Sequence, residues 1–203
     1  MSPSHSAVTA IPYDKHFGHA SGGKIGMWTF LVTDAMTFGG FLIAYANLRA
    51  YLDWPTPSDH LNIGLTAVAT FILIMSSVSM VLALASGQED HRRGMILWLG
   101  ITIIGGLSFL GIQSYEWTHL IRDGMTFTRF SHGVPQFGST FFLITGFHGF
   151  HVLSGVIYLA VIMAKAMGGR YDGGNVDHVE LAGLFWHFVD LIWILVFTFI
   201  YLL

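Results

Sequence analysis

Long uncharged runs alternate with short polar segments along most of this chain. Residues 61–87, 95–115 and 133–164 contain no Asp, Glu, Lys or Arg. The runs 26–48 and 181–203 each contain a single acid, Asp34 and Asp190. Each run reaches the roughly 20 residues that a helix needs to cross about 30 Å of hydrocarbon. The pattern predicts five transmembrane helices, at about residues 26–50, 61–86, 94–118, 137–165 and 180–203.

These spans are predicted to be helices because they are continuously apolar. The strands of a membrane barrel would alternate apolar and polar residues, and a backbone in lipid must satisfy its own hydrogen bonds. The fold class is therefore an all-α integral membrane protein, with a five-helix membrane domain over residues 26–203. Residues 1–25 lack a long apolar run, and we expect them to form a flexible polar tail.

The composition agrees with a membrane protein. Hydrophobic residues make up 53% of the 203 residues and charged residues 10%, whereas a soluble domain has about 25% charged residues. The chain contains no cysteine, which excludes disulfides, CxxC metal sites and thiolate-ligated clusters.

The basic residues predict the orientation. With five spans the tail and two of the loops share one face, where six basic residues lie in or beside them: Lys15, Lys24, Arg92, Arg93, Lys165 and Arg170. The opposite face has Arg49, Arg122 and Arg129. The positive-inside rule then predicts a cytoplasmic amino terminus and a carboxy terminus on the outer side. Several aromatic residues lie near span ends, as interfacial aromatics do: Tyr51, Trp54, Trp98, Trp117, Tyr171 and Tyr201.

Several ionisable side chains lie well inside the runs. At about 1.5 Å of rise per residue, five of them on three spans share a similar depth: Asp34, His148, His151, His187 and Asp190. A charged group near the bilayer centre costs roughly 3 kcal/mol or more, so each should face the bundle and have a partner. We expect them to form a structural polar seam that fixes the helix geometry.

Within the segment "FWHFVDLIW", Trp186 lies four residues before Asp190, and His187 lies three residues before Asp190. Such spacings place side chains on one helix face, so Asp190 can pair along its own helix. At the outer end of span 94–118, Gln113 and Glu116 have the same spacing of three residues. This pair is either a solvated helix end or a contact that faces the bundle.

The segment "GSTFFLITGFHGFHVLSG" leaves two interpretations open. His148 and His151 share a helix face, and with a third histidine at matching depth they could ligate haem or copper, as in a membrane electron carrier. Alternatively, both imidazoles hydrogen-bond to neighbouring helices and support the packing. A small transporter is a third possibility, although neither inverted repeats nor broken helices are visible.

The same segment, together with "FWHFVDLIWILVFTFIYLL", "FLVTDAMTFGGF", "GIQSYEW" and "ELAG", closely resembles subunit III of the haem–copper terminal oxidases, in the five-helix bacterial form. The motifs occur in the family's order over about residues 26–203. The resemblance implies helices in two groups around a V-shaped cleft that binds phospholipid. It also implies an accessory subunit without catalytic residues, metal or haem of its own, because the redox centres lie in subunits I and II. The two span histidines are then structural.

The resemblance further implies a place beside subunit I in the bacterial cytoplasmic membrane, where the chain stabilises that subunit and supports proton uptake. A small subunit IV or a respiratory supercomplex is a further expected partner, and nucleic acid is not. Asp34 aligns with the carbodiimide-reactive carboxylate of the family, which is Glu in most cytochrome c oxidases. "GFHGFH" and "HFVD" favour the cytochrome c branch, whereas Asp34 and "FTFIYLL" favour a quinol-oxidising enzyme.

Overall fold

The computed structural model describes residues 22–130, 133–171 and 176–203, except the side chains of residues 59 and 60. Most of the predicted polar tail, residues 1–21, lies outside this part of the chain. The described helices are α1 (Gly22–Tyr51), α2 (Pro57–His60), α3 (Ile63–Gln88), α4 (Arg92–Arg122), α5 (Pro135–Met167) and α6 (Asp177–Val196), which continues as a π-helix, η2 (Phe197–Leu202). Five helical segments are long and apolar enough to cross a membrane. The prediction of an all-α protein with five transmembrane helices is confirmed.

Local chemistry explains where several helices begin and end. Pro135 occupies the first turn of α5, where a missing N–H costs nothing. The side chain of Asn62 caps α3 by accepting a hydrogen bond of 3.0 Å from the Leu65 N–H. At the other end of the bundle, Arg92 donates to the carbonyl oxygens of Ala166 and Met167. These last carbonyls of α5 have no partner within the helix, so the contact caps α5 and joins it to the start of α4.

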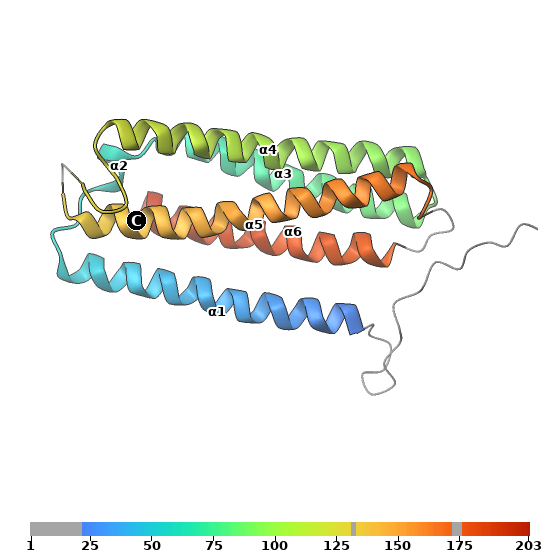
Figure 1. The fold of residues 1–203 in the computed structure, drawn as a ribbon, viewed down its shortest axis with the longest axis horizontal. Coiled ribbons are helices and arrows are strands. Elements are labelled where there is room, and N and C mark those ends of the chain that lie inside the picture. Colours follow the sequence, from blue (N-terminus) through green and yellow to red (C-terminus); the bar gives the residue numbers. More distant parts are fainter. Residues whose placement is uncertain (1–21, 131–132, 172–175) are drawn as a thin grey trace, which may run out of the picture.

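Four of the spans form a closed group, and α1 lies outside it. Helix α3 contacts α4, α4 contacts α5, α5 contacts α6, and α6 contacts α3, while α1 packs on α5 and α6. Figure 1 shows α1 as the blue helix along one side of the bundle. Only 17% of its most apolar stretch is buried, against 50% for the last span. A salt bridge of 2.8 Å between Lys24 and Glu180 joins α1 to the start of α6. The V-shaped lipid cleft stays a prediction.

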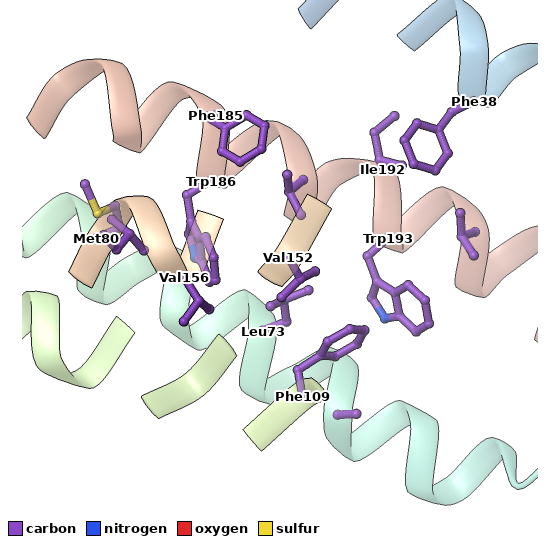
Figure 2. Close-up of a cluster of buried hydrophobic side chains, with 14 of the residues drawn as sticks. Phe38, Leu73, Met80, Phe109, Val152, Val156, Phe185, Trp186, Ile192 and Trp193 are labelled. Atoms are coloured by element: carbon purple, nitrogen blue, oxygen red, sulfur yellow. The ribbon is translucent and has the colours of Figure 1, made fainter. Parts of the chain in front are cut away.

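Two tryptophans of α6 fill the centre of the four-helix group. Trp186 lies beside Val156, and Trp193 lies beside Phe109 (Figure 2). All four are nearly or fully buried. Trp186 has room because Gly106 lacks a side chain: a Cβ there would lie 2.5 Å from the Trp186 ring. Small residues thus allow close packing where lipid supplies no hydrophobic drive between helices.

Candidate functional site: buried polar clusters between the spans

Asp34 and His151 meet between α1 and α5. Asp34 Oδ2 lies 3.3 Å from His151 Nε2, and both side chains are buried. The distance suits an ion pair, although the two atoms do not meet the geometry of a hydrogen bond. The other ring nitrogen of His151, Nδ1, lies 2.8 Å from the Phe147 carbonyl oxygen. This pair is the only described ion pair that links two spans through a buried carboxylate.

The geometry of this pair limits which ring nitrogen of His151 can carry a hydrogen. A carbonyl oxygen can only accept, so the Nδ1 that faces Phe147 carries a hydrogen. Nε2 then carries a hydrogen only if the ring is an imidazolium; otherwise it presents a lone pair. A lone pair 3.3 Å from an anionic oxygen would repel it. A hydrogen between the two facing atoms, on Nε2 or on Oδ2, would remove this repulsion.

His148 is fully buried among aromatic rings. Its ring centroid lies 4.8 Å from that of Trp193 and 5.7 Å from that of Phe109. The sequence predicts hydrogen bonds from His148 to neighbouring helices, but neither ring nitrogen has such a partner among the described residues. Burial without a partner disfavours a charged ring. His148 is therefore a packing element among aromatic rings, and the predicted hydrogen bonds are replaced by ring contacts.

A second polar cluster joins α3 to α6. The Ser77 hydroxyl lies 3.0 Å from His187 Nδ1, and the same hydroxyl interacts with the Asp190 carboxylate. His187 and Asp190 are thus brought together through a serine of the neighbouring helix. Trp186, one residue before His187, donates a hydrogen bond of 3.1 Å to Oγ of Ser76, the residue before Ser77 on α3.

The third cluster surrounds Glu116, which is buried. Tyr201 donates a hydrogen bond of 2.8 Å to Glu116 Oε2, and Gln113 Nε2 lies 3.4 Å from the same oxygen. The Thr66 hydroxyl lies 3.1 Å from Oε1. Within the described ranges no cationic side chain forms a salt bridge with Glu116. Of the two interpretations of the Gln113–Glu116 pair, the structure shows the contact that faces the bundle.

The residues of the predicted seam therefore lie in separate clusters. Asp34 and His151 form one, His187 and Asp190 belong to another, and His148 makes only ring contacts. No group of three or more His, Asp or Glu side chains in the described part of the chain is placed to hold a metal ion. The described part of the chain therefore provides small sets of polar groups between helices.

Some important partners were not predicted. Ser77 and Thr66 are ordinary hydroxyl residues of an apolar run, and Tyr201 was expected at an interface with the aromatic residues of other span ends. Tyr201 is instead 1% exposed and lies inside the bundle. Tyr171 is likewise buried, which raises the pKa of its hydroxyl. The pair "SS" in the middle of span 61–86 was the available signal for the second cluster, since hydroxyls at mid-span usually bond across helices.

Comparison with known proteins decides the family. The family model described as cytochrome c oxidase subunit III matches residues 10–203. This chain belongs to the cytochrome c oxidase subunit III family. The resemblance of its motifs to subunit III is thereby confirmed.

Individual members of the subunit III family match over most of their length. The cytochrome bo(3) ubiquinol oxidase subunit 3 of Pseudomonas aeruginosa is 34% identical over 196 residues, which are 95% of this chain and 91% of that protein. The cytochrome c oxidase subunit 3 of Alkalihalophilus pseudofirmus is 32% identical over 180 residues, 88% of this chain and 85% of that one. That of Synechocystis is 36% identical over 191 residues, 93% and 78% respectively. Relatives of similar identity thus carry both cytochrome c and quinol names.

Proposed function

We propose that this chain is the accessory, non-catalytic subunit III of a proton-pumping terminal oxidase that takes electrons from cytochrome c. It packs beside subunit I and stabilises it, and haem and copper lie in subunits I and II. One observation carries this proposal: each buried acid of the described residues has at least one contact with a side chain on a neighbouring helical segment of the same chain. Asp34 pairs with His151, Asp190 with Ser77, and Glu116 with Tyr201 and Thr66. Such groups order a scaffold and leave the chemistry to other subunits.

The position of His148 supports the absence of a redox centre in this chain. Haem ligation needs an imidazole nitrogen directed at open space for the iron. The His148 ring instead packs against Trp193 and Phe109, and Nδ1 of His151 faces a backbone carbonyl. This geometry disfavours His148 and His151 as haem ligands, and it therefore argues against a haem-binding electron carrier.

A groove at the end of α5 supports phospholipid binding. It encloses about 470 Å³ and is lined by Val161, Ala164, Lys165, Gly168 and Arg170. Two cationic side chains at the end of an apolar span suit an anionic headgroup, because each basic residue near a membrane surface contributes about 1 kcal/mol to the attraction of anionic lipid. The acyl chains would lie along the exposed apolar side of α5.

The Asp34–His151 pair supports a role in proton uptake. Its two facing atoms, Asp34 Oδ2 and His151 Nε2, lie buried between two spans. Carboxylate and imidazole side chains are the groups that proteins use most often for proton transfer. On the resemblance of its segment to the family, we assign Asp34 the place of the family's carbodiimide-type carboxylate.

The arrangement of the helix ends supports the orientation. The start of α1, the start of α4 and the end of α5 lie at the same end of the bundle (Figure 1). This end carries Lys24, Arg92, Arg93, Lys165 and Arg170. We therefore place it on the cytoplasmic side of a bacterial inner membrane.

Co-purification tests the proposed function. A tagged form of this chain, isolated from membranes in mild detergent, should bring with it an oxygen-reducing complex that contains haem and copper subunits. The chain released from the complex should show no Soret band. Isolation without an oxidase, or haem bound to the released chain, would contradict the proposal.

A second candidate is subunit III of a quinol-oxidising enzyme, and the Pseudomonas aeruginosa relative favours it. The co-purified subunit II distinguishes the two. Copper-ligating cysteines in that subunit would indicate cytochrome c as the donor, and their absence would indicate quinol.

A further inference from the structure

A half-buried histidine lies in the membrane-facing surface between α3 and α6. His187 is ten residues from the start of α6 at Asp177, or about 15 Å along the helix axis. Ser77 is eleven residues from the end of α3 at Gln88, which places it at a similar depth. Both side chains are partly exposed, and their contact of 3.0 Å uses one ring nitrogen of His187, Nδ1.

Apolar side chains surround this polar spot. On α3, Ile74 and Val81 stand one turn before and after Ser77 and are 37% and 53% exposed. On α6, Leu191 and Ile194 follow His187 by four and seven residues and are 57% and 42% exposed. These spacings place each set along one side of its helix. We call the surface made by Ile74, Ser77, Val81, His187, Leu191 and Ile194 the α3–α6 face.

One polar atom at this face and one buried next to it lack a hydrogen-bond partner in the described part of the chain. Asp190 lies three residues after His187, and its Oδ1 is buried without a hydrogen-bond partner among the described residues. The hydrogen bonds of the described residues leave His187 Nε2 without a partner as well. Acyl chains neither donate nor accept hydrogen bonds, so polar groups of this kind are expensive against lipid.

The outward side of α5 shows what a surface without this feature looks like. Phe150, Leu153, Ile157 and Val161 follow one another at spacings of three and four residues and are 66%, 44%, 57% and 45% exposed. This row is wholly apolar, and hydrocarbon satisfies it. The α3–α6 face differs by the imidazole of His187 and the hydroxyl of Ser77 at its centre.

We infer that the α3–α6 face is a docking surface for a transmembrane helix of another oxidase subunit, which carries a hydrogen-bonding side chain at the depth of His187. The partner side chain engages His187 Nε2, and its helix covers Leu191 and Ile194. Hydrogen bonds between spans and close apolar contact are what hold membrane helices together. The inference rests on the proposed function, since it requires a multi-subunit complex, and it assigns the surface by which this chain joins that complex.

Site-specific photocrosslinking tests the contact. The photoreactive amino acid p-benzoylphenylalanine would replace Leu191 in the α3–α6 face, or Ile157 on α5 as the matched control with the same exposed fraction of 57%. We expect irradiation of intact membranes to give an adduct with another oxidase subunit from position 191, at a yield at least about fivefold above position 157. Lipid adducts alone at 191, or a stronger protein adduct at 157, would overturn the inference.

Two substitutions of His187 separate docking from folding. His187→Gln keeps a hydrogen-bonding side chain, and His187→Leu removes it at similar size. We expect His187→Leu to lower the fraction of oxidase that retains this chain after detergent washing by about fivefold or more, with His187→Gln close to the native chain. The thermal unfolding of the released chain shows whether the Leu variant still folds. Equal retention of both variants would contradict the docking role.

These results are distinguishable from a failure of the proposed function. If the native chain does not co-purify with an oxidase, the function itself is wrong. If the native chain co-purifies but crosslinks through α5, only the docking surface is wrong.

Discussion

Tyr201 donates a hydrogen bond of 2.8 Å to the Glu116 carboxylate, although 85 positions separate the two residues in the chain. The bond joins η2 to the carboxy-terminal half of α4. Tyr201 lies in the π-helix η2, where the N–H of Leu203 bonds to the carbonyl oxygen of Thr198. The wider turn of a π-helix changes the direction in which its side chains point, and here it directs Tyr201 into the bundle.

Removal of the Tyr201 hydroxyl should destabilise the protein. The variant Tyr201→Phe keeps the ring but takes away the donor nearest to Glu116 Oε2. A buried acceptor that loses its partner costs about 1–3 kcal/mol. Unfolding of the purified protein in rising concentrations of a denaturing detergent, monitored by circular dichroism, measures the decrease in the free energy of unfolding.

Tyr51→Phe is the matched control, because it removes the same hydroxyl from a side chain that is 86% exposed. Its unfolding midpoint should equal that of the native chain. A Tyr201→Phe variant as stable as the Tyr51→Phe variant would show that the Glu116 contact adds no stability.

Gly106 should not tolerate a methyl group. An added Cβ would lie 2.5 Å from the Trp186 ring and 2.7 Å from Val156, and the buried indole has no room to retreat. Overpacking of this kind costs about 1–3 kcal/mol. We expect Gly106→Ala to lower the unfolding midpoint, whereas Gly111→Ala on the same helix, with no atom within 4 Å of its Cβ, should not. Equal midpoints for the two variants would mean that α4 and α6 can separate at little cost.

The sequence predicted the spans and the buried acids but not the residues that pair with the acids. Spacing along one helix shows which side chains share its face, and on that basis Asp190 was expected to pair with Trp186 or His187. In the structure Trp186 and His187 turn to Ser76 and Ser77 of α3. Partners on another helix depend on the rotation of that helix about its axis. A uniformly apolar run such as α3 does not encode this rotation in its hydrophobic pattern.

The environment of Glu116 could not be predicted from the sequence either. Its spacing of three residues from Gln113 places both side chains on one helix face, but the sequence did not show whether that face is solvated or faces the bundle. The contacts of Glu116 with Thr66 and Tyr201, which lie on two other helical segments, show that this face lies inside the bundle. For Asp34 and His151, a count of residues supplied the similar depth on two spans, but it did not predict that these two residues would be in contact.

Asp34→Asn should separate the structural use of the Asp34–His151 pair from its use as a proton holder. The amide can donate a hydrogen bond to a neutral His151 ring and so preserves the contact between α1 and α5, but it cannot accept or release a proton. We expect normal assembly together with an earlier fall of oxygen consumption as the pH rises, because proton supply then limits turnover. The pH profile of the purified oxidase measures this effect, and Asp53→Asn at an exposed position serves as the control. An unchanged profile would remove the role in proton uptake.

Neutralisation of the groove at the end of α5 should release bound phospholipid. Lys165 and Arg170 are the two cationic side chains that line it, and each contributes about 1 kcal/mol to the attraction of an anionic headgroup. The double variant Lys165→Gln/Arg170→Gln should therefore bind anionic lipid about 30-fold more weakly, since about 1.4 kcal/mol is a factor of ten. Native mass spectrometry of the purified complex, titrated with phosphatidylglycerol, gives the affinity. Arg93→Gln, an exposed cation at the same end of the bundle but outside the groove, should change it little. If Arg93→Gln weakens binding by as much per charge removed as the double variant does, the attraction comes from the charge of this whole end of the bundle, and the groove is no specific site.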